Sequence, residues 1–287
     1  MYFIFFVMPL LSVIKVTAQG RYAQKNTKSF SDILLFNSVV FFATAVILAV
    51  IFLRAFPPIE LIIYAVLGGI FTIAFQTFYL LAFKNGPVAP TVIINSFSIV
   101  LVLLAGRIFF DEKWSIFTII GLIFMFITFY LVPARKDNKK ANSKWLLLTL
   151  CVLLFSGAYN IESLFIARNE LTKWKSEFLI FSFLIASIIC LFATVFNVKI
   201  KKEPITIKLD WKLTVATLII ATTLGAYNLL NIYALKWFPS YIVMPIINGS
   251  IIVMVMVINS ILDREKPTLK MIMGTLSAVV GIVLLNL

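Results

Sequence analysis

Two charged side chains, Lys15 and Glu162, lie deep inside long apolar stretches of the sequence. A charge at the middle of a bilayer costs about 2.5–3.5 kcal/mol on insertion scales, so each side chain is expected to face a partner or a polar cavity. Two interpretations follow. The residues form one buried salt bridge that holds two parts of the chain together, or they line a substrate site. Both hold if the bridge opens when substrate binds.

An ammonium group and a carboxylate in one cavity favour a zwitterionic substrate, such as an amino acid. Lys15 would bind the substrate's carboxylate, and Glu162 would bind its ammonium group or carry a coupling proton. Tyr159 could add a cation–π surface. Hydrogen bonds and an aromatic wall would come from Gln76, Tyr79, Asn95, Tyr159, Asn160, Tyr227, Asn228, Asn231 and Asn248.

These polar residues recur at helical spacing. At 100° per residue, Ser156, Tyr159, Asn160, Glu162 and Ser163 fall within an arc of roughly 160° on one helix. A single Ser or Thr is explained by a hydrogen bond to its own helix. Asn, Gln and Tyr residues on five helices would each need a separate partner in hydrocarbon, so we predict one common polar cavity.

Other chemistry is poorly supported by the sequence. His is absent, and no GxSxG, HExxH or GxxxxGK[ST] string occurs. Cys151 and Cys190 lie inside apolar runs without CxxC spacing, which argues against a disulfide framework or a thiolate metal site. We therefore expect no enzyme activity, no metal and no cofactor.

The composition predicts an integral membrane protein. Of 287 residues, 62% are apolar and only 13% are charged, so no room remains for a soluble domain. The net charge of +13 would suggest nucleic acid in a soluble chain. Here nearly every charge falls between apolar runs, where it meets water and lipid head groups, and no nucleic-acid partner is expected.

Ten apolar runs, bounded by charges or Pro, predict an all-α polytopic membrane protein with ten transmembrane helices. The runs cover residues 2–20, 30–53, 59–83, 88–106, 115–133, 145–167, 176–198, 212–235, 241–261 and 268–286. The runs 115–133 and 268–286 are almost purely apolar and contain Gly121, Gly274 and Gly281. They are interpreted as helices for packing or dimerisation, and a monomer and a homodimer both stay open.

The second half of the chain repeats the first. Shifting the numbering by 152 aligns Lys84 with Lys236 and Asp111 with Asp263, and both lysines stand three residues before a Pro. The domains are then a first repeat over 1–133, a basic linker over 134–144 and a second repeat over 145–287. Because five helices is an odd number, the two repeats must cross the membrane in opposite senses.

The whole chain resembles the drug/metabolite transporter superfamily, in its EamA-like branch. The resemblance rests on the two five-helix repeats, on the segment from Ser156 to Asn160, which is similar to the family's Trp-Gly-x-Asn, and on acids before each repeat's last helix, at Asp111, Glu112 and Glu265. The sequence departs from the family in lacking Trp before Gly157 and in having Phe97 and Ser250 where Pro is usual.

The resemblance implies a carrier of small metabolites, commonly an exporter, with both termini cytoplasmic. The loops on one side carry 17 Lys and Arg against 7 on the other, which by the positive-inside rule puts the termini outside, so orientation stays open. We expect a secondary transporter in a bacterial inner membrane that works by alternating access around a midplane cavity. The alternatives are a flippase for a lipid-linked head group and a membrane scaffold without transport.

Overall fold

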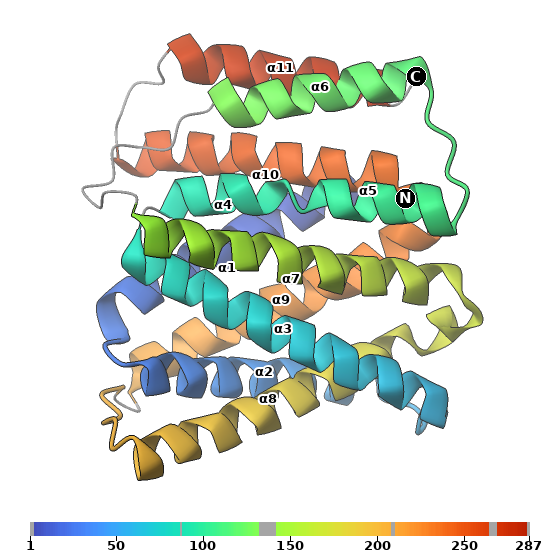
Figure 1. Cartoon of the computed structure of the whole chain (residues 1–287). Coiled ribbons are helices and arrows are strands. Elements are labelled where there is room, and N and C mark those ends of the chain that lie inside the picture. The colour runs from blue at the N-terminus through green and yellow to red at the C-terminus, as the bar shows by residue number, and fades with distance from the viewer. Residues whose placement is uncertain (1–2, 87, 132–141, 208–209, 264–268, 286–287) are drawn as a thin grey trace.

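The computed structural model describes residues 3–86, 88–131, 142–207, 210–263 and 269–285, and these form helices and no strand. The helices are α1 (Ile4–Asn26), α2 (Phe30–Phe52), α3 (Ile59–Asn85), α4 (Val88–Ser96), α5 (Ile99–Phe109), α6 (Ile116–Leu131), α7 (Ser143–Arg168), the 3₁₀ turn η1 (Glu170–Trp174), α8 (Lys175–Ile200), α9 (Trp211–Trp237), α10 (Ser240–Asp263) and α11 (Leu269–Leu285). Figure 1 shows that they run along one common direction, with the two chain ends at the same end of the bundle.

The predicted runs all appear as helices within the described residues, with one difference. The run at 88–106 was expected to be continuous, but it is broken between α4 and α5. At the break, the N–H groups of Phe97 and Ser98 bond to the carbonyls of Ile94 and Asn95, three residues back instead of four. This tighter winding ends α4 and lets the chain restart as α5.

The distribution of side chains suits a lipid environment. Large apolar residues point outward, as at Val50, which is 81% exposed, and Phe192, which is 72% exposed. Polar residues such as Gln76 and Asn231 are buried inside. Among the described residues, six helices are long and apolar enough to cross a bilayer, and shorter apolar helices accompany them.

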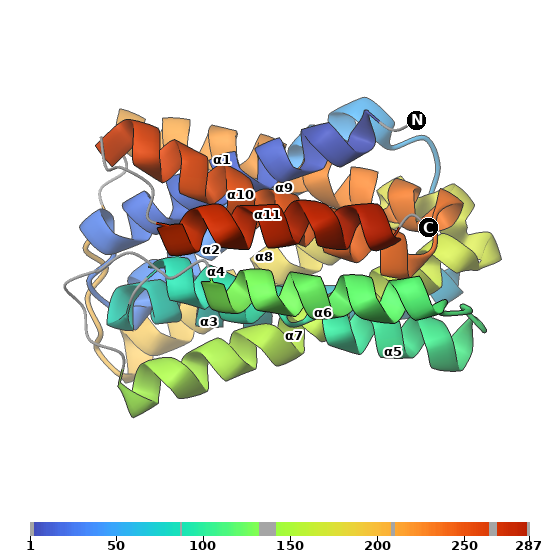
Figure 2. The same cartoon turned by 90° about the horizontal axis from the view of Figure 1, so that it is seen from above.

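The helix contacts of the first half have counterparts in the second half. Helix α1 packs on α9, and the corresponding helices of the other half, α7 and α3, also pack on each other. Helices α2 and α8, which hold equivalent places in the two halves, pack together on one side of the bundle. On the opposite side α6 lies beside α11, as Figures 1 and 2 show.

The pair α6 and α11 is held by close packing. Gly121, Gly274 and Gly281 are buried, and the Ser277 hydroxyl donates to the Phe124 carbonyl at 2.8 Å. The prediction that these apolar segments are packing helices is confirmed within the chain itself.

Two acidic residues, Asp32 and Glu203, cap the N-terminus of α2. Ser29 and Asp32 form a capping box, in which each side chain accepts from the other residue's backbone N–H. Glu203, from the connection between α8 and α9, accepts from the N–H of Phe30 and from the N–H and hydroxyl of Ser31. Desolvation raises the pKa of Glu203, but these hydrogen bonds together outweigh it, so its pKa is lowered.

Candidate functional site

A polar cavity lies near the middle of the bundle, where helices from both halves meet. Its empty volume is about 810 Å³, part of which is open to solvent. It is lined by Ser12, Lys15, Val16, Thr72, Phe75, Gln76, Tyr79, Val92, Asn95, Ser96, Ser98, Ser156, Tyr159, Asn160, Phe183, Leu224, Tyr227, Asn228, Met244, Asn248 and Ile251.

Most of the residues proposed from the sequence meet in this cavity. Those that line it are Lys15, Gln76, Tyr79, Asn95, Tyr159, Asn160, Tyr227, Asn228 and Asn248. Glu162 and Asn231 do not line it. Of the predicted pair of charges, the cavity is therefore lined by the cation Lys15 but not by the anion Glu162.

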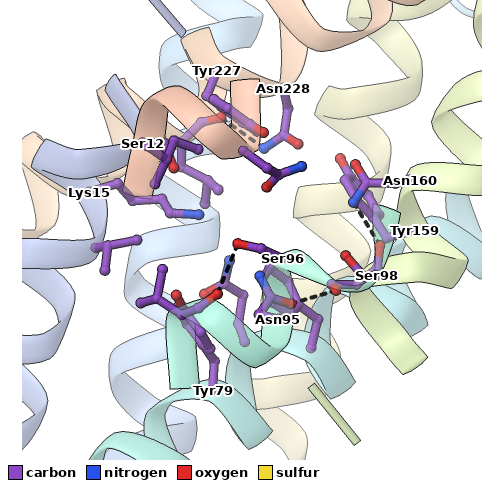
Figure 3. A pocket seen from close by; sticks show the side chains of 18 of the residues that line it. Ser12, Lys15, Tyr79, Asn95, Ser96, Ser98, Tyr159, Asn160, Tyr227 and Asn228 are labelled. Carbon is purple, nitrogen blue, oxygen red and sulfur yellow. Dashed lines mark hydrogen bonds between the residues drawn. The ribbon is translucent and has the colours of Figure 1, made fainter. Parts of the chain in front are cut away.

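Lys15 comes from the middle of α1, and Figure 3 shows its amine pointing into the space between the other labelled side chains. The side chain is 6% exposed, and its Nζ lies 5.8 Å from the ring centroids of both Phe75 and Tyr227. No ion pair to Lys15 exists among the described residues, so the predicted salt bridge with Glu162 is not formed in this structure. Two aromatic faces give this ammonium group a partial substitute for water.

The amides of the cavity are held by bonds to their own helices. The side-chain N–H groups of Asn160, Asn228 and Asn248 donate to the carbonyls of Ser156, Leu224 and Met244, at 2.8–2.9 Å. Each of these bonds uses one N–H of the side chain. The rest of the amide in Asn228 and Asn248 can therefore hydrogen-bond a ligand from a fixed position, whereas Asn160 Oδ1 already accepts from Asn231.

Two further bonds join the helices around the cavity. The Ser156 hydroxyl donates to Asn95 Oδ1 at 2.6 Å, which ties α7 to α4. Gln19 Nε2 donates to Gln76 Oε1 at 3.0 Å, which ties α1 to α3. Because each bond crosses a helix contact, the polar side chains also fix the shape of the cavity.

The break between α4 and α5 brings several residues into the cavity. Asn95, Ser96 and Ser98 all line it, which one continuous helix face would not allow for residues so close in sequence. Sequence reasoning missed Ser96, together with the aromatic residues Phe75 and Phe183. Residues 91–105 contain no Pro or Gly, so no local signal in the sequence marks the break.

Glu162 faces away from the cavity. Its side chain is 6% exposed, and its two carboxylate oxygens have no hydrogen-bond partner in the described part of the chain. It packs on Gly68 of α3, where an added Cβ would lie 2.9 Å from Oε2. The structure therefore places Glu162 outside the cavity lining, because its position on α7 points it toward α3 and α8.

Asn231 is a neighbour of the cavity instead of a lining residue. It is fully buried on α9, and its Nδ2 donates to Asn160 Oδ1 at 3.3 Å. It lies on the same helix face as Tyr227 and Asn228, but one turn farther along the axis. Its contribution is to hold Asn160 in place.

At one end of the bundle an acidic residue before α6, Glu112, links two helices. The Glu112 carboxylate accepts from Arg168 Nη2 at 3.1 Å, from the Ser240 N–H at 2.9 Å and from the Ser240 hydroxyl at 2.5 Å. It thus joins the end of α7 to the start of α10. The tight approach requires Gly106, where an added Cβ would lie 2.5 Å from Ser240 Oγ. The matching acid of the second half, Glu265, lies outside the described residues, as does linker segment 134–141.

The other end of the bundle has a different contact between the halves. The Trp145 indole N–H at the start of α7 donates to Thr91 Oγ1 of α4 at 2.9 Å. The ring covers Gly86 so closely that an added Cβ would collide with Trp145 Cδ1. Helices of the two halves therefore contact each other toward both ends of the bundle.

The sequence model of the EamA-like transporter family matches this chain twice, over residues 3–133 and 143–287, and so covers nearly all of it. The chain belongs to the EamA-like transporter family. This family of the drug/metabolite transporter superfamily consists of membrane transporters and not of enzymes. The protein is therefore an integral multi-pass membrane protein of the transporter type, with a small-molecule substrate.

The fold has solved counterparts. One of them, described only as "Crystal structure of protein", is similar to this EamA-like chain, with a TM-score of 0.74 and 14% sequence identity. The similarity covers 98% of this chain and 94% of that one. At this identity the likeness supports the fold alone. No curated protein matches the sequence.

Proposed function

We propose that this protein is a secondary transporter that carries a small polar metabolite through the bilayer by alternating access, with the central cavity as its substrate site. The observation that carries the proposal is the buried amine of Lys15, which points into a polar cavity without an anionic partner among the described residues. A buried cation without a counter-ion is costly, so its retention inside an apolar bundle is expected where it binds an anionic group.

We infer an amino acid or another zwitterion as the substrate. The Lys15 amine would bind the substrate's carboxylate by a charge-assisted hydrogen bond. Glu162 does not line the cavity, so the substrate's ammonium group would instead meet amide oxygens, such as that of Asn228, and the aromatic face of Tyr159. The Tyr159 hydroxyl has no hydrogen-bond partner within the described residues, so it can also accept a hydrogen bond from the ammonium group.

We propose that the transporter consists of two inverted repeats, 1–133 and 145–287, joined by the linker 134–144. The two family matches and the paired helix contacts support this division. Alternating access then follows from rocking of the repeats around the cavity. The Glu112–Arg168 contact at one end and the Trp145–Thr91 contact at the other would open in turn. We propose that the protein is an exporter, in line with what the family resemblance implies, and that it lies in a bacterial inner membrane.

A thermal-shift screen of the purified protein tests the substrate class. Amino acids, simple amines and head-group sugars are each added, and a ligand at 100 times its Kd stabilises the protein by about 2.7 kcal/mol. We expect amino acids to stabilise the native chain and to have little effect on Lys15→Met. Stabilisation by head-group sugars alone would instead support a flippase, and stabilisation by none of the three would count against transport of these classes.

A further inference from the structure

The carboxyl group of Glu162 lies in a second buried polar spot, separate from the cavity. Its Oε2 atom and the Ser182 hydroxyl of α8 lie against the same point of α3, each 2.9 Å from where Gly68 would carry a Cβ. Neither carboxylate oxygen of Glu162 nor the Ser182 hydroxyl has a hydrogen-bond partner among the described residues. Phe178 of α8 closes the same spot, at 3.1 Å from that point.

Within the described ranges, no counter-charge reaches this spot. Tyr159, one turn earlier on α7, is the titratable neighbour on the same helix, and it lines the cavity together with Tyr79 of α3 and Tyr227 of α9. The charged residues on the surrounding elements α3, α5, η1, α8 and α9 lie toward helix ends, at Glu60, Lys84, Arg107, Glu170, Lys173, Lys175, Glu177, Lys199, Lys212 and Lys236.

An ionised carboxylate is poorly accommodated in such a place. A buried charge needs a counter-charge or hydrogen bonds to its oxygens. Among the described residues there is no counter-charge, and the Gly68 backbone N–H is the single group near these oxygens that favours the charged form. A neutral carboxylic acid is far less costly to bury there than a carboxylate, because it carries no charge that must be desolvated. The closed packing of α7 on α3 and α8 therefore suits the protonated side chain.

We propose that Glu162 is a proton-binding site of the transporter, distinct from the substrate cavity, and that its proton couples transport to a pH gradient. This inference rests on the proposed transport function. Release of the proton leaves a carboxylate that must reach water, so it requires α7 to move away from Gly68 and Ser182. The same helix carries Tyr159 and Asn160 into the cavity, so movement of α7 links loss of the proton to a change of the substrate site.

Infrared spectroscopy of the purified protein in lipid tests the site without any substrate. The native protein at neutral pH is expected to show the carbonyl band of a protonated carboxylic acid, and Glu162→Gln should lose it. Glu162→Asp keeps a carboxyl group and should shift the band, which separates loss of the acid from loss of the fold. Glu177→Gln is the matched control. It removes a different buried carboxyl group, on α8, and should leave the band unchanged.

Transport provides the second measurement. Proteoliposomes are given a ¹⁴C-labelled amino-acid mixture and a pH gradient of one unit. One exchanged proton per substrate predicts about tenfold accumulation in the native protein, since one pH unit equals a tenfold ratio. Glu162→Gln should lose this accumulation and keep exchange of labelled for unlabelled amino acids.

Two outcomes would overturn the proton site. One is the absence of a protonated band that depends on Glu162 near neutral pH, and the other is gradient-driven accumulation in Glu162→Gln equal to that of the native protein. The infrared measurement contains no substrate. If the native protein transports no amino acid but shows the band, the proposed substrate fails while the proton site stands.

Discussion

Replacement of Lys15 by Met separates the two roles that a buried lysine can have. The substitution removes the charge and keeps a flexible side chain of similar length. Lys15 is 6% exposed and has no ion pair among the described residues. If it serves the substrate and not the fold, Lys15→Met should not destabilise the protein, and it should weaken substrate binding at least tenfold.

The size of the stability effect follows from the contacts of Lys15. Insertion scales assign about 2.5–3.5 kcal/mol to a lysine at mid-membrane. Its contacts to Phe75 and Tyr227, both at 5.8 Å, are near the outer limit for cation–π attraction and return about 0.5–1 kcal/mol each. We therefore expect Lys15→Met to be more stable than the native protein by about 1–2 kcal/mol.

Thermal unfolding of the purified protein in one detergent measures this effect as an upward shift of the midpoint. Lys25→Met is the matched control, because Lys25 is an exposed lysine on the same helix and its change should stay within about 0.5 kcal/mol. If Lys15 were instead part of a buried salt bridge that holds the repeats together, its loss would cost about 3–5 kcal/mol. A destabilisation of that size would refute the reasoning.

Further predictions concern the ends of the bundle. Glu112→Ala removes the ion pair to Arg168 and the two hydrogen bonds from Ser240, and leaves Arg168 its bond to the Phe238 carbonyl. It should lower stability by about 1–3 kcal/mol in thermal unfolding, and an unchanged midpoint would show that the contact is unimportant. Gly86→Ala places a methyl group against Trp145 and should cost about 1–3 kcal/mol, and a double-mutant cycle with Trp145→Leu should recover part of it. If the stability changes of Gly86→Ala and Trp145→Leu simply added, the close packing of Trp145 on Gly86 would be contradicted. Since the pKa of Glu203 is lowered on folding, its contribution is present above pH 4.5 and is lost as the pH falls through the folded pKa, so Glu203→Gln should be less stable than the native chain at neutral pH and the difference should vanish in acid.

The helices could be predicted because their signals are local. Long apolar runs between charged loops determine where a chain can cross a membrane, and caps such as Ser29 with Asp32 mark helix starts. The break at Phe97 was missed because residues 91–105 contain no Pro or Gly. It accompanies contacts to another helix, such as the bond from Ser156 to Asn95, which a single run does not reveal.

The cavity was predicted in outline because amides in an apolar bundle must gather where they can be satisfied. The two residues that missed it show the limit of helical geometry. Glu162 stands at one edge of the polar arc on α7, and an arc of roughly 160° is wider than one cavity covers. Asn231 shares the face of Tyr227 and Asn228 but differs in depth, since each residue advances about 1.5 Å along the axis. Whether a side chain reaches the cavity depends on its helix face and on its position along the helix axis. Both are set by packing against other helices, which the sequence of one helix does not reveal.

The most direct test of the account is exchange of a ¹⁴C-labelled amino-acid mixture in proteoliposomes that contain the native protein, Lys15→Met or Lys25→Met. A charge-assisted hydrogen bond contributes about 1.5–3 kcal/mol, which predicts a loss of at least tenfold in the exchange rate for Lys15→Met and none for Lys25→Met. Exchange by Lys15→Met at the native rate would contradict the assignment of the cavity as a site that binds its substrate through Lys15.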